Sequence, residues 1–320
     1  MAVERVERPL AAARDVPLGA GTAGSRGGTG AAPRVVPERR GRGPAADALY
    51  RLLRDRTAMV GLAIVVVMAA LAVAAPLVAR RDPLEQELVQ RLKPPSPAHW
   101  FGTDNLGRDV YARVLYGGRI SLRVGFVSVM VGVVVGALLG LVAGYGGRMA
   151  DSLISRVMEV VLAFPSTLLA IAIVAARGPG IENTMMAIGA VSVPVYARLM
   201  RASVLALRER DFVTAARCTG VSGARILFRH ILPNGLSPLI VQATLGIATA
   251  IIEAAALGFL GLGAQPPTPE WGLMLTDARN FLLNAPWAML FPGLAIMLTV
   301  LGFNLFGDGL RDALDPQLKQ

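Results

Sequence analysis

VGFVSVMVGVVVGALLGLVAGYGG, residues 124–147, carries no charged side chain. About 20 helical residues cross the roughly 30 Å hydrocarbon core of a bilayer, and this run is longer than that. Strands of a membrane barrel alternate polar and apolar residues over shorter segments, whereas this run is continuously apolar. The run therefore predicts a membrane-spanning helix.

Comparable apolar runs recur along the chain. Hydrophobic residues make up 54% of the 320 residues, and the mean hydropathy is +0.54. Both values exceed those of ordinary soluble domains. We expect an all-α membrane bundle with six spans, of which the fourth is the shortest. The runs cover residues 57–79, 124–147, 160–176, 183–197, 236–264 and 281–307.

Basic residues predict the orientation of this bundle. If the N-terminus lies inside, 22 of the 32 Lys and Arg residues fall in inner segments, as the positive-inside rule requires. The first outer loop, residues 80–123, holds eight of the remainder and is the exception. We expect both termini to be cytoplasmic.

The chain divides into three regions. Residues 1–50 are rich in Ala, Gly, Arg and Pro and predict a disordered basic cytoplasmic tail. Residues 51–123 contain the first span and the outer loop, and residues 124–320 contain the other five spans. The basic residues behind the net charge of +10 are almost all arginines, and many of them flank spans. This placement favours contact with membrane lipid over nucleic acid.

The sequence contains few residues that could form a catalytic site, a metal site or a nucleotide-binding site. The single cysteine, Cys218, excludes a disulfide within the chain and a thiolate metal cluster. The two histidines, His99 and His230, are predicted on opposite faces of the membrane, so they cannot share a metal. No G-x-x-x-x-G-K-[ST] phosphate loop is present. We expect no enzymatic activity and no bound cofactor.

Two spans contain features with more than one interpretation. Gly132, Gly136, Gly140 and Gly144 lie on one helix face, which suits packing within the chain or, alternatively, a dimer or moving interface. Pro165 should bend the third span, either as ordinary bundle geometry or as a kink that lines a pathway.

Glu253 is the lone acid deep in an apolar run. Ionisable residues inside a membrane are candidates for function. A structural role, by capping or by pairing with an arginine of the first outer loop, is the alternative that we favour.

Residues 198–235 predict a helix–turn–helix hairpin between the fourth and fifth spans. Gly220 can adopt the positive φ that closes a helix. Ser222 can cap the next helix, and Pro233 should end it. The hairpin has a small surface at Ala215 and Ala216 and several arginines around it, so it suits docking into a partner. A solvated hairpin without a partner is the alternative.

The segment TAARCTGVSGARILFRHILP, residues 214–233, resembles the cytoplasmic coupling loop of permeases in bacterial ATP-binding-cassette importers. That loop reads Glu-Ala-Ala, three residues, Gly, nine residues, Ile, one residue, Leu-Pro. Thr214 stands in the place of the Glu and His230 in the place of the Ile. The resemblance implies that the ATPase-coupling positions include Asp211, Thr214, Ala215, Ala216, Gly220, Leu232 and Pro233.

Three further blocks are similar to the second permease of the dipeptide, oligopeptide and nickel branch. They are FGTDNLGRDVYARVLYGGRISLRVG (101–125), EAAALGFLGLGAQPPTPEWGLML (253–275) and GDGLRDALDPQLK (307–319). The resemblance implies a heterodimer with a sister permease in the bacterial inner membrane. It also implies two ATPase subunits, which use the ATP, and an extracytoplasmic solute-binding protein. Peptides are the expected cargo, with nickel or another small solute as the alternative.

The first outer loop also has two interpretations. GTDNLGRDV (102–110) contains turn-forming residues, and YARVLYGGRISLRV (111–124) predicts an amphipathic helix along the membrane surface. The loop can be a passive elbow or a contact for the solute-binding protein, and we favour the elbow.

Two other protein classes fit the sequence less well. A secondary transporter usually shows inverted repeats and several charges inside the membrane, and neither is evident here. A membrane enzyme would need clustered His, Asp, Glu or Cys residues, which the sequence lacks.

Overall fold

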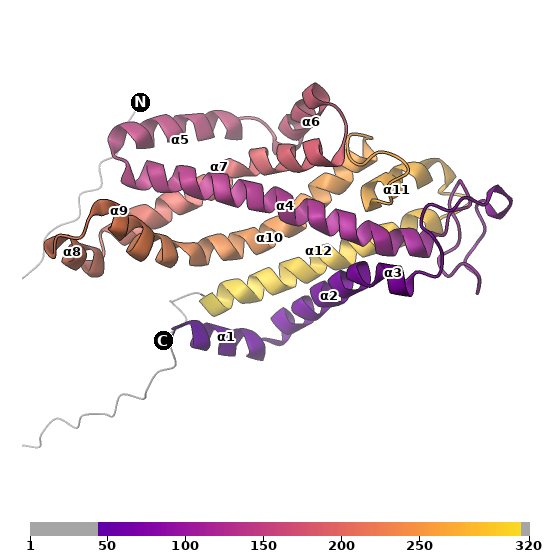
Figure 1. Cartoon of the computed structure of the whole chain (residues 1–320), viewed down its shortest axis with the longest axis horizontal. Coiled ribbons are helices and arrows are strands. Elements are labelled where there is room, and N and C mark those ends of the chain that lie inside the picture. Colours follow the sequence, from indigo (N-terminus) through magenta and orange to yellow (C-terminus); the bar gives the residue numbers. More distant parts are fainter. Residues whose placement is uncertain (1–43, 315–320) are drawn as a thin grey trace, which may run out of the picture. The chain divides into compact units, whose positions relative to one another are not determined.

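A computed structural model describes residues 44–314 of the chain. Regular structure in this range is helical, apart from one antiparallel bridge between Thr103 and Asp109 (Figure 1). The all-α prediction is confirmed. The α-helices are α1 (Pro44–Arg54), α2 (Arg56–Val73), α3 (Ala75–Val78), α4 (Val110–Tyr145), α5 (Arg148–Leu162), α6 (Ser166–Arg177), α7 (Ile181–Arg208), α8 (Asp211–Cys218), α9 (Gly223–Ile226), α10 (Leu232–Phe259), α11 (Trp271–Ala278) and α12 (Trp287–Leu314).

Five described segments are long and apolar enough to cross a membrane: α2, α4, α7, α12 and the continuous segment Gly223–Phe259 that contains α9 and α10. The bent pair of α5 and α6 brings the number to six if the pair counts as one span. The fourth predicted span, residues 183–197, lies within the longer helix α7. The helix is longer than the apolar run because it also includes polar residues at both ends of the run.

Region boundaries differ from the prediction at the N-terminus. Residues 1–43 of the predicted tail lie outside the described residues, and the last seven belong to α1. Proline is favourable in the first turn of a helix, where its missing N–H costs nothing, and α1 begins at Pro44.

The glycine face of α4 packs against α7. A Cβ added at Gly136 would lie 2.6 Å from the carbonyl oxygen of Val193, and one at Gly144 would lie 2.7 Å from the Cβ of Val204. Such separations leave no room for a side chain, so the glycines allow the two backbones to approach closely. Of the two interpretations, packing within the chain is the one that the structure shows.

Pro165 breaks the third predicted span instead of bending it. The helix α5 ends at Leu162, α6 starts at Ser166, and their axes differ by 90°. Proline cannot donate a backbone hydrogen bond and disfavours helical geometry in the residue before it, here Phe164. The expectation of one bent helix over residues 160–176 is therefore corrected.

The helix α4 also differs from expectation, because residues 111–124 do not lie along the membrane as a separate helix. They form the start of a single helix of 36 residues, about 54 Å long at 1.5 Å per residue. Gly117 and Gly118 allow Trp271 to pack closely against this helix, since Cβ atoms there would approach its ring to 2.9 and 3.2 Å. The helix therefore extends well beyond a 30 Å bilayer core.

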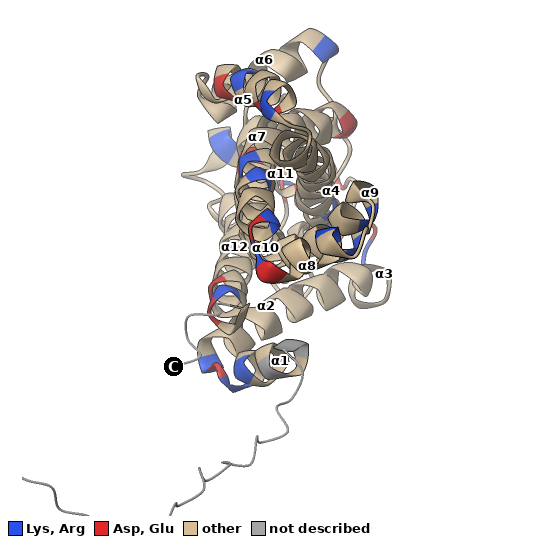
Figure 2. Cartoon of the chain, turned by 90° about the vertical axis from the view of Figure 1, so that its left-hand side faces the viewer, with Lys and Arg blue, Asp and Glu red and all other residues tan. Residues whose placement is uncertain are grey.

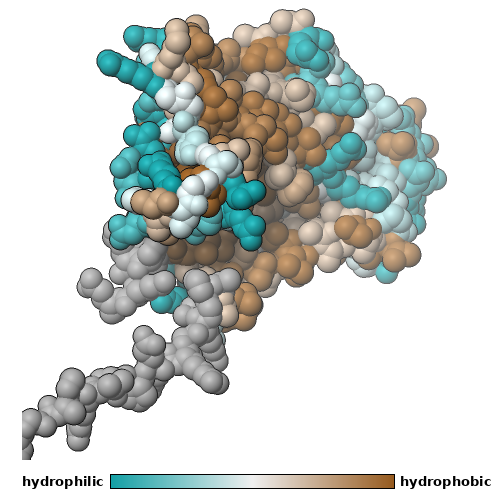
Figure 3. Space-filling model, turned by 60° about the vertical axis from the view of Figure 1, so that its left-hand side comes forward, coloured by the Kyte–Doolittle hydropathy of each residue, from teal (hydrophilic) through white to brown (hydrophobic). Residues whose placement is uncertain are grey.

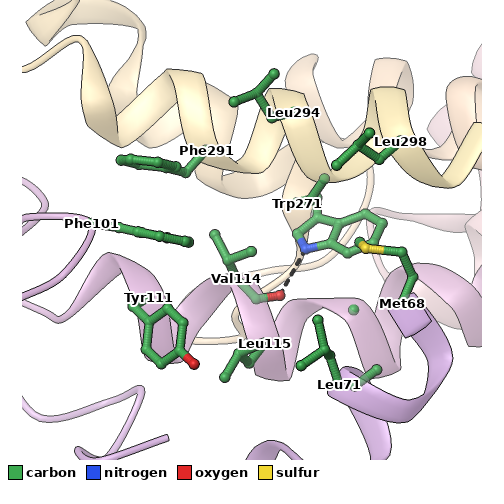
Figure 4. A pocket seen from close by; sticks show the side chains of 13 residues that line it. Met68, Leu71, Phe101, Tyr111, Val114, Leu115, Trp271, Phe291, Leu294 and Leu298 are labelled. Atoms are coloured by element: carbon green, nitrogen blue, oxygen red, sulfur yellow. Dashed lines mark hydrogen bonds between the residues drawn. The ribbon is translucent and has the colours of Figure 1, made fainter. Parts of the chain in front are cut away.

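An apolar pocket of about 320 Å³ lies between α2, α4 and α12 (Figure 4). Trp271 forms part of its wall and donates a hydrogen bond from Nε1 to the carbonyl oxygen of Val114 at 2.9 Å. The rings of Phe101 and Phe291 stack with their centroids 3.8 Å apart. These contacts join the outer loop, α4 and α12 in one core.

Buried charges hold the outer loop together. Asp104 accepts a hydrogen bond from Arg108 Nε at 2.6 Å and lies 3.6 Å from Arg113 Nε. Arg108 also reaches Asp277 at 3.0 Å, and Asp109 pairs with His99 at 3.0 Å. Arg108 is only 2% exposed and Arg113 1%. Since Arg108 and Asp109 are both buried, they stabilise the elbow and do not offer a surface to a partner.

Glu270 anchors α11. Its carboxylate accepts the N–H groups of Gly272 and Leu273, both at 2.8 Å, and the hydroxyl of Ser121 on α4 at 3.1 Å. Burial raises the pKa of the Glu270 carboxyl, and these hydrogen bonds partly oppose that shift.

Apolar side chains cover much of the outside of the bundle. Figure 3 shows hydrophobic surface between two hydrophilic regions. Val66 and Val67 on α2 and Val134 and Leu138 on α4 are each at least half exposed. Exposed aliphatic side chains at this density suit contact with lipid, not water.

Candidate functional site

The candidate site is the hairpin, which we define as residues 209–231. The predicted bounds of 198–235 are corrected, because residues 198–208 belong to α7 and residues 232–235 to α10. The chain leaves α7 at Arg208 and forms α8, a turn, α9 and a π-helical turn, Leu227–Ile231, that leads into α10. The hairpin lies at one end of the bundle, and α11 and the outer loop lie at the other (Figure 1).

The turn of the hairpin is a Schellman motif. Gly220 has a φ of +76°. Its N–H donates to the carbonyl oxygen of Arg217 at 3.0 Å, and the N–H of Val221 donates to that of Ala216 at 3.1 Å. These two bonds satisfy carbonyls that the end of α8 leaves open. The positive φ expected of Gly220 is confirmed.

Two local expectations for the second arm are corrected. Ser222 occupies the N-cap position of α9, but its side chain makes no capping hydrogen bond. Pro233 does not end the helix, because it lies in the first turn of α10. The preceding π turn, in which Leu232 N–H donates to the carbonyl of Leu227, brings Pro233 to a position where no N–H is needed.

The inner side of the hairpin is fixed to the bundle. Val213, Ile226 and Ile231 are at most 1% exposed and belong to the main core. Arg208 donates to the carbonyl oxygen of Gly144, the last glycine of the α4 stripe, at 3.3 Å. The hairpin should therefore move together with α4, α7 and α10.

The side of the hairpin that faces away from the bundle is exposed, and no partner chain is described on it. Asp211, Thr214 and Ala215 are exposed, and Ala216 is half-buried. Phe212 is 41% exposed and Phe228 59%. Figure 2 views this end and shows basic residues around α8 and α9. The arginines of the hairpin are Arg210, Arg217, Arg225 and Arg229.

Sequence reasoning did not identify Phe212 and Phe228 as surface residues. They lie in different helical segments, α8 and the π turn, so no pattern within one helix predicts that both rings are exposed. Exposed aromatic side chains beside a flat surface of small residues are typical anchors of an interface.

The other two predicted residues lie outside the hairpin, Pro165 between α5 and α6 and Glu253 on α10. Glu253 is half-buried near the opposite end of that helix. Its hydrogen-bond partner is the hydroxyl of Ser166 at 3.5 Å, directly after Pro165. Among the described residues, Glu253 forms no ion pair with an arginine of the outer loop. Three of those arginines, Arg81, Arg108 and Arg113, lie against Glu87, Asp104 and Asp277 instead. Among residues 44–314, no cluster of His, Cys, Asp and Glu could hold a metal.

Comparison with known families decides the class of the chain. Residues 136–320 match the family model of binding-protein-dependent transport system inner membrane components. The chain belongs to this family of transport permeases. Residues 43–95 of the permease also match the N-terminal transmembrane domain of oligopeptide transport permease C. The resemblance implied by the sequence is therefore confirmed, and the permease is a multi-pass membrane protein that takes part in transport.

Curated relatives align with most of the permease. It is 55% identical over 276 residues to the dipeptide transport system permease protein of Alkalihalophilus pseudofirmus, covering 86% of this chain and 91% of the relative. It is 51% identical over 271 residues to the di/tripeptide transport system permease protein of Pseudomonas aeruginosa, covering 83% and 89%.

A solved structure supports the fold of the permease. The MetNI methionine ABC transporter in an inward-facing conformation contains a chain with a TM-score of 0.52 at 19% identity. The match covers 63% of the permease and 96% of that chain.

Gly220 offers a direct test of the hairpin turn. A Cβ at this position meets no atom within 4 Å, so only the backbone conformation opposes a side chain. Gly220→Val should strain the turn by about 1–2 kcal/mol. We expect transport by the assembled complex to fall several-fold while assembly survives. Gly220→Asn is the matched control, since Asn tolerates positive φ. Normal uptake by the valine variant would show that the turn geometry is not needed for coupling.

Proposed function

We propose that the permease forms the membrane pathway of an ATP-binding-cassette importer for dipeptides and oligopeptides, together with a sister permease. The observation that carries this proposal is the 55% identity to a dipeptide permease over 86% of the chain. Nickel or another small solute is the alternative cargo. The proposed selectivity for peptides is shared with an extracytoplasmic solute-binding protein.

The hairpin end of the bundle is assigned to the cytoplasm. The arginines of the hairpin and the N-terminal helix α1 lie at this end, which agrees with the positive-inside rule. This orientation makes both termini cytoplasmic in a bacterial inner membrane. It directs the outer loop and α11 toward the solute-binding protein.

The hairpin is the proposed docking surface for ATPase subunits. Phe212 and Phe228 supply apolar anchors, and Ala215 supplies a flat area between charged groups. When the ATPase subunits bind ATP and close, the docked hairpin moves, and the helices fixed to it carry the movement to the pathway. The permease itself binds no ATP in this scheme and needs no cofactor.

Ala215→Asp should weaken the binding of the ATPase subunits by at least tenfold, because docking would bury an unpaired charge. Cys218, the single cysteine, is exposed at the end of α8, so a maleimide dye can label the native chain there. ATPase subunits should slow this labelling in the wild type but much less in the variant. Ala176→Asp is the control, because Ala176 is exposed on α6 and away from the hairpin. Equal protection of Cys218 in wild type and Ala215→Asp would move the docking surface elsewhere.

The proposed function is tested by purifying the permease from its native membrane in mild detergent and identifying bound proteins by mass spectrometry. A second permease and ATPases with phosphate loops should co-purify. The recovered complex, placed in liposomes with its binding protein, should then accumulate a dipeptide only when ATP is supplied. Uptake driven by a proton gradient without any ATPase would instead identify a secondary transporter.

A further inference from the structure

A polar stripe runs along one face of α10. Gln242, Gly246, Thr249 and Glu253 are spaced at i, i+4, i+7 and i+11, and eleven residues make almost exactly three helical turns, so all four share one face. All are at least partly exposed. Polar side chains are costly against lipid and normally face the interior of a bundle or a water-filled space.

The stripe borders a cavity of about 230 Å³. Ser192 and Tyr196 of α7 form the facing wall, and Ser166 of α6 closes the end next to Glu253. Gly246 allows the hydroxyl of Tyr196 to lie directly against α10, because that hydroxyl is the atom that a Cβ at Gly246 would meet first. The cavity therefore presents hydroxyl and amide groups and one carboxylate within a wall that is otherwise apolar and includes Ile188, Val191 and Val195.

The Glu253 carboxylate has no positively charged partner among the described residues. Among the described residues, Glu253 takes part in no ion pair, and no Lys or Arg lines the cavity. The hydroxyl of Ser166 is its single hydrogen-bond donor there, at a long 3.5 Å. An ionised carboxylate accepts about four hydrogen bonds, so Glu253 keeps most of its capacity for a ligand.

We propose that Glu253 receives the protonated α-amino group of a peptide in transit, while Gln242 and Tyr196 bind its peptide groups. This inference rests on the proposed function, which supplies peptides as the cargo. The stripe is about 16 Å long at 1.5 Å per residue. An extended chain advances about 3.3–3.6 Å per residue, so the stripe is as long as about four extended residues.

The test compares peptide binding by the purified permease–ATPase complex, without binding protein, before and after Glu253→Gln. A radiolabelled dipeptide competes with the same dipeptide acetylated at its N-terminus, which carries no ammonium group. The wild type should prefer the free amine by about tenfold or more, the effect of one hydrogen bond to a charged group. Glu253→Gln should lose this preference, and Glu253→Asp should retain part of it.

Glu182→Gln is the matched control, because Glu182 is exposed in the first turn of α7 and is not part of the cavity wall. It should keep the full preference. Ser166→Ala separates binding from a structural role. If Glu253 serves only to hold α6 through Ser166, Ser166→Ala and Glu253→Gln should both prevent assembly of the complex. Loss of assembly in both variants would therefore overturn the proposal. An unchanged preference in Glu253→Gln, or no preference in the wild type, also overturns it.

Transport measurements distinguish this failure from failure of the proposed function. In liposomes that contain the complete importer, Glu253→Gln should deliver about tenfold less dipeptide per ATP hydrolysed, with ATPase activity retained. If the wild-type importer takes up no dipeptide with ATP, the proposed function fails. If uptake is normal in wild type and variant alike, only the role of Glu253 fails.

Discussion

Gly140→Leu should yield almost no folded permease. A Cβ at Gly140 would lie 2.7 Å from the Cβ of Met200 and 3.0 Å from the backbone nitrogen of Arg201. Since these are atoms at or next to the backbone of α7, no rotamer change can relieve the clash, and α4 and α7 must separate. Loss of this packing should cost more than about 4 kcal/mol. The measurements are the yield of monodisperse protein in detergent and the midpoint of its thermal unfolding.

Gly293→Leu provides the matched control for that experiment. Gly293 is also in a membrane-spanning helix, α12, but a Cβ there meets no atom within 4 Å. Leucine is a better helix former than glycine by several tenths of a kcal/mol, so this variant should be as stable as the wild type or slightly more stable. A wild-type unfolding midpoint for Gly140→Leu would contradict the observed packing of α4 on α7.

Asp104→Ala should destabilise the outer half of the permease by about 3–5 kcal/mol, because removing one partner leaves buried charges unpaired. Arg113 would lose its nearest carboxylate, and Arg108 would keep only Asp277. Alanine also removes the acceptor for the N–H groups of Leu106 and Arg108, each at 2.9 Å. We expect a lower midpoint of thermal unfolding and faster proteolysis of the loop at residues 80–109.

Two further variants show whether the charge itself matters. Asp104→Asn keeps an acceptor oxygen and should recover part of the lost stability. Glu87→Ala removes the partner of Arg81 in a pair whose side chains are 35% and 41% exposed, so it should cost no more than about 1 kcal/mol. Equal destabilisation by Asp104→Ala and Glu87→Ala would show that burial of the cluster contributes little.

Periodic and local features were predictable from the sequence. The apolar runs gave the spans, because length and charge suffice to identify a membrane helix. The single face of Gly132 to Gly144 follows from helical geometry, although the sequence could not say which helix would cover it. Gly220 was identifiable because few residues other than glycine adopt positive φ at the end of a helix.

Features that depend on distant contacts were not predictable. Arg108, which already binds the nearby Asp104, meets Asp277 only after the chain has folded back, and Glu270 gains its role by reaching Ser121 on α4. The π turn before Pro233 was missed because proline ordinarily indicates the end of a helix. Glu253 was recognised as unusual, but its neighbours Ser166 and Tyr196 come from other helices and could not be assigned.

Residues Gly223–Phe259 form one uninterrupted helical segment of 37 residues, which joins the hairpin to Glu253 without an intervening loop. A displacement at the hairpin end of this segment should therefore reach Glu253 without passing through a loop. Under the proposed function, this segment contains no loop that could absorb the movement while ATP is consumed. We expect the ratio of peptide delivered to ATP hydrolysed to be nearly constant, and inserting a flexible glycine pair within the π turn should make this ratio fall before assembly is lost.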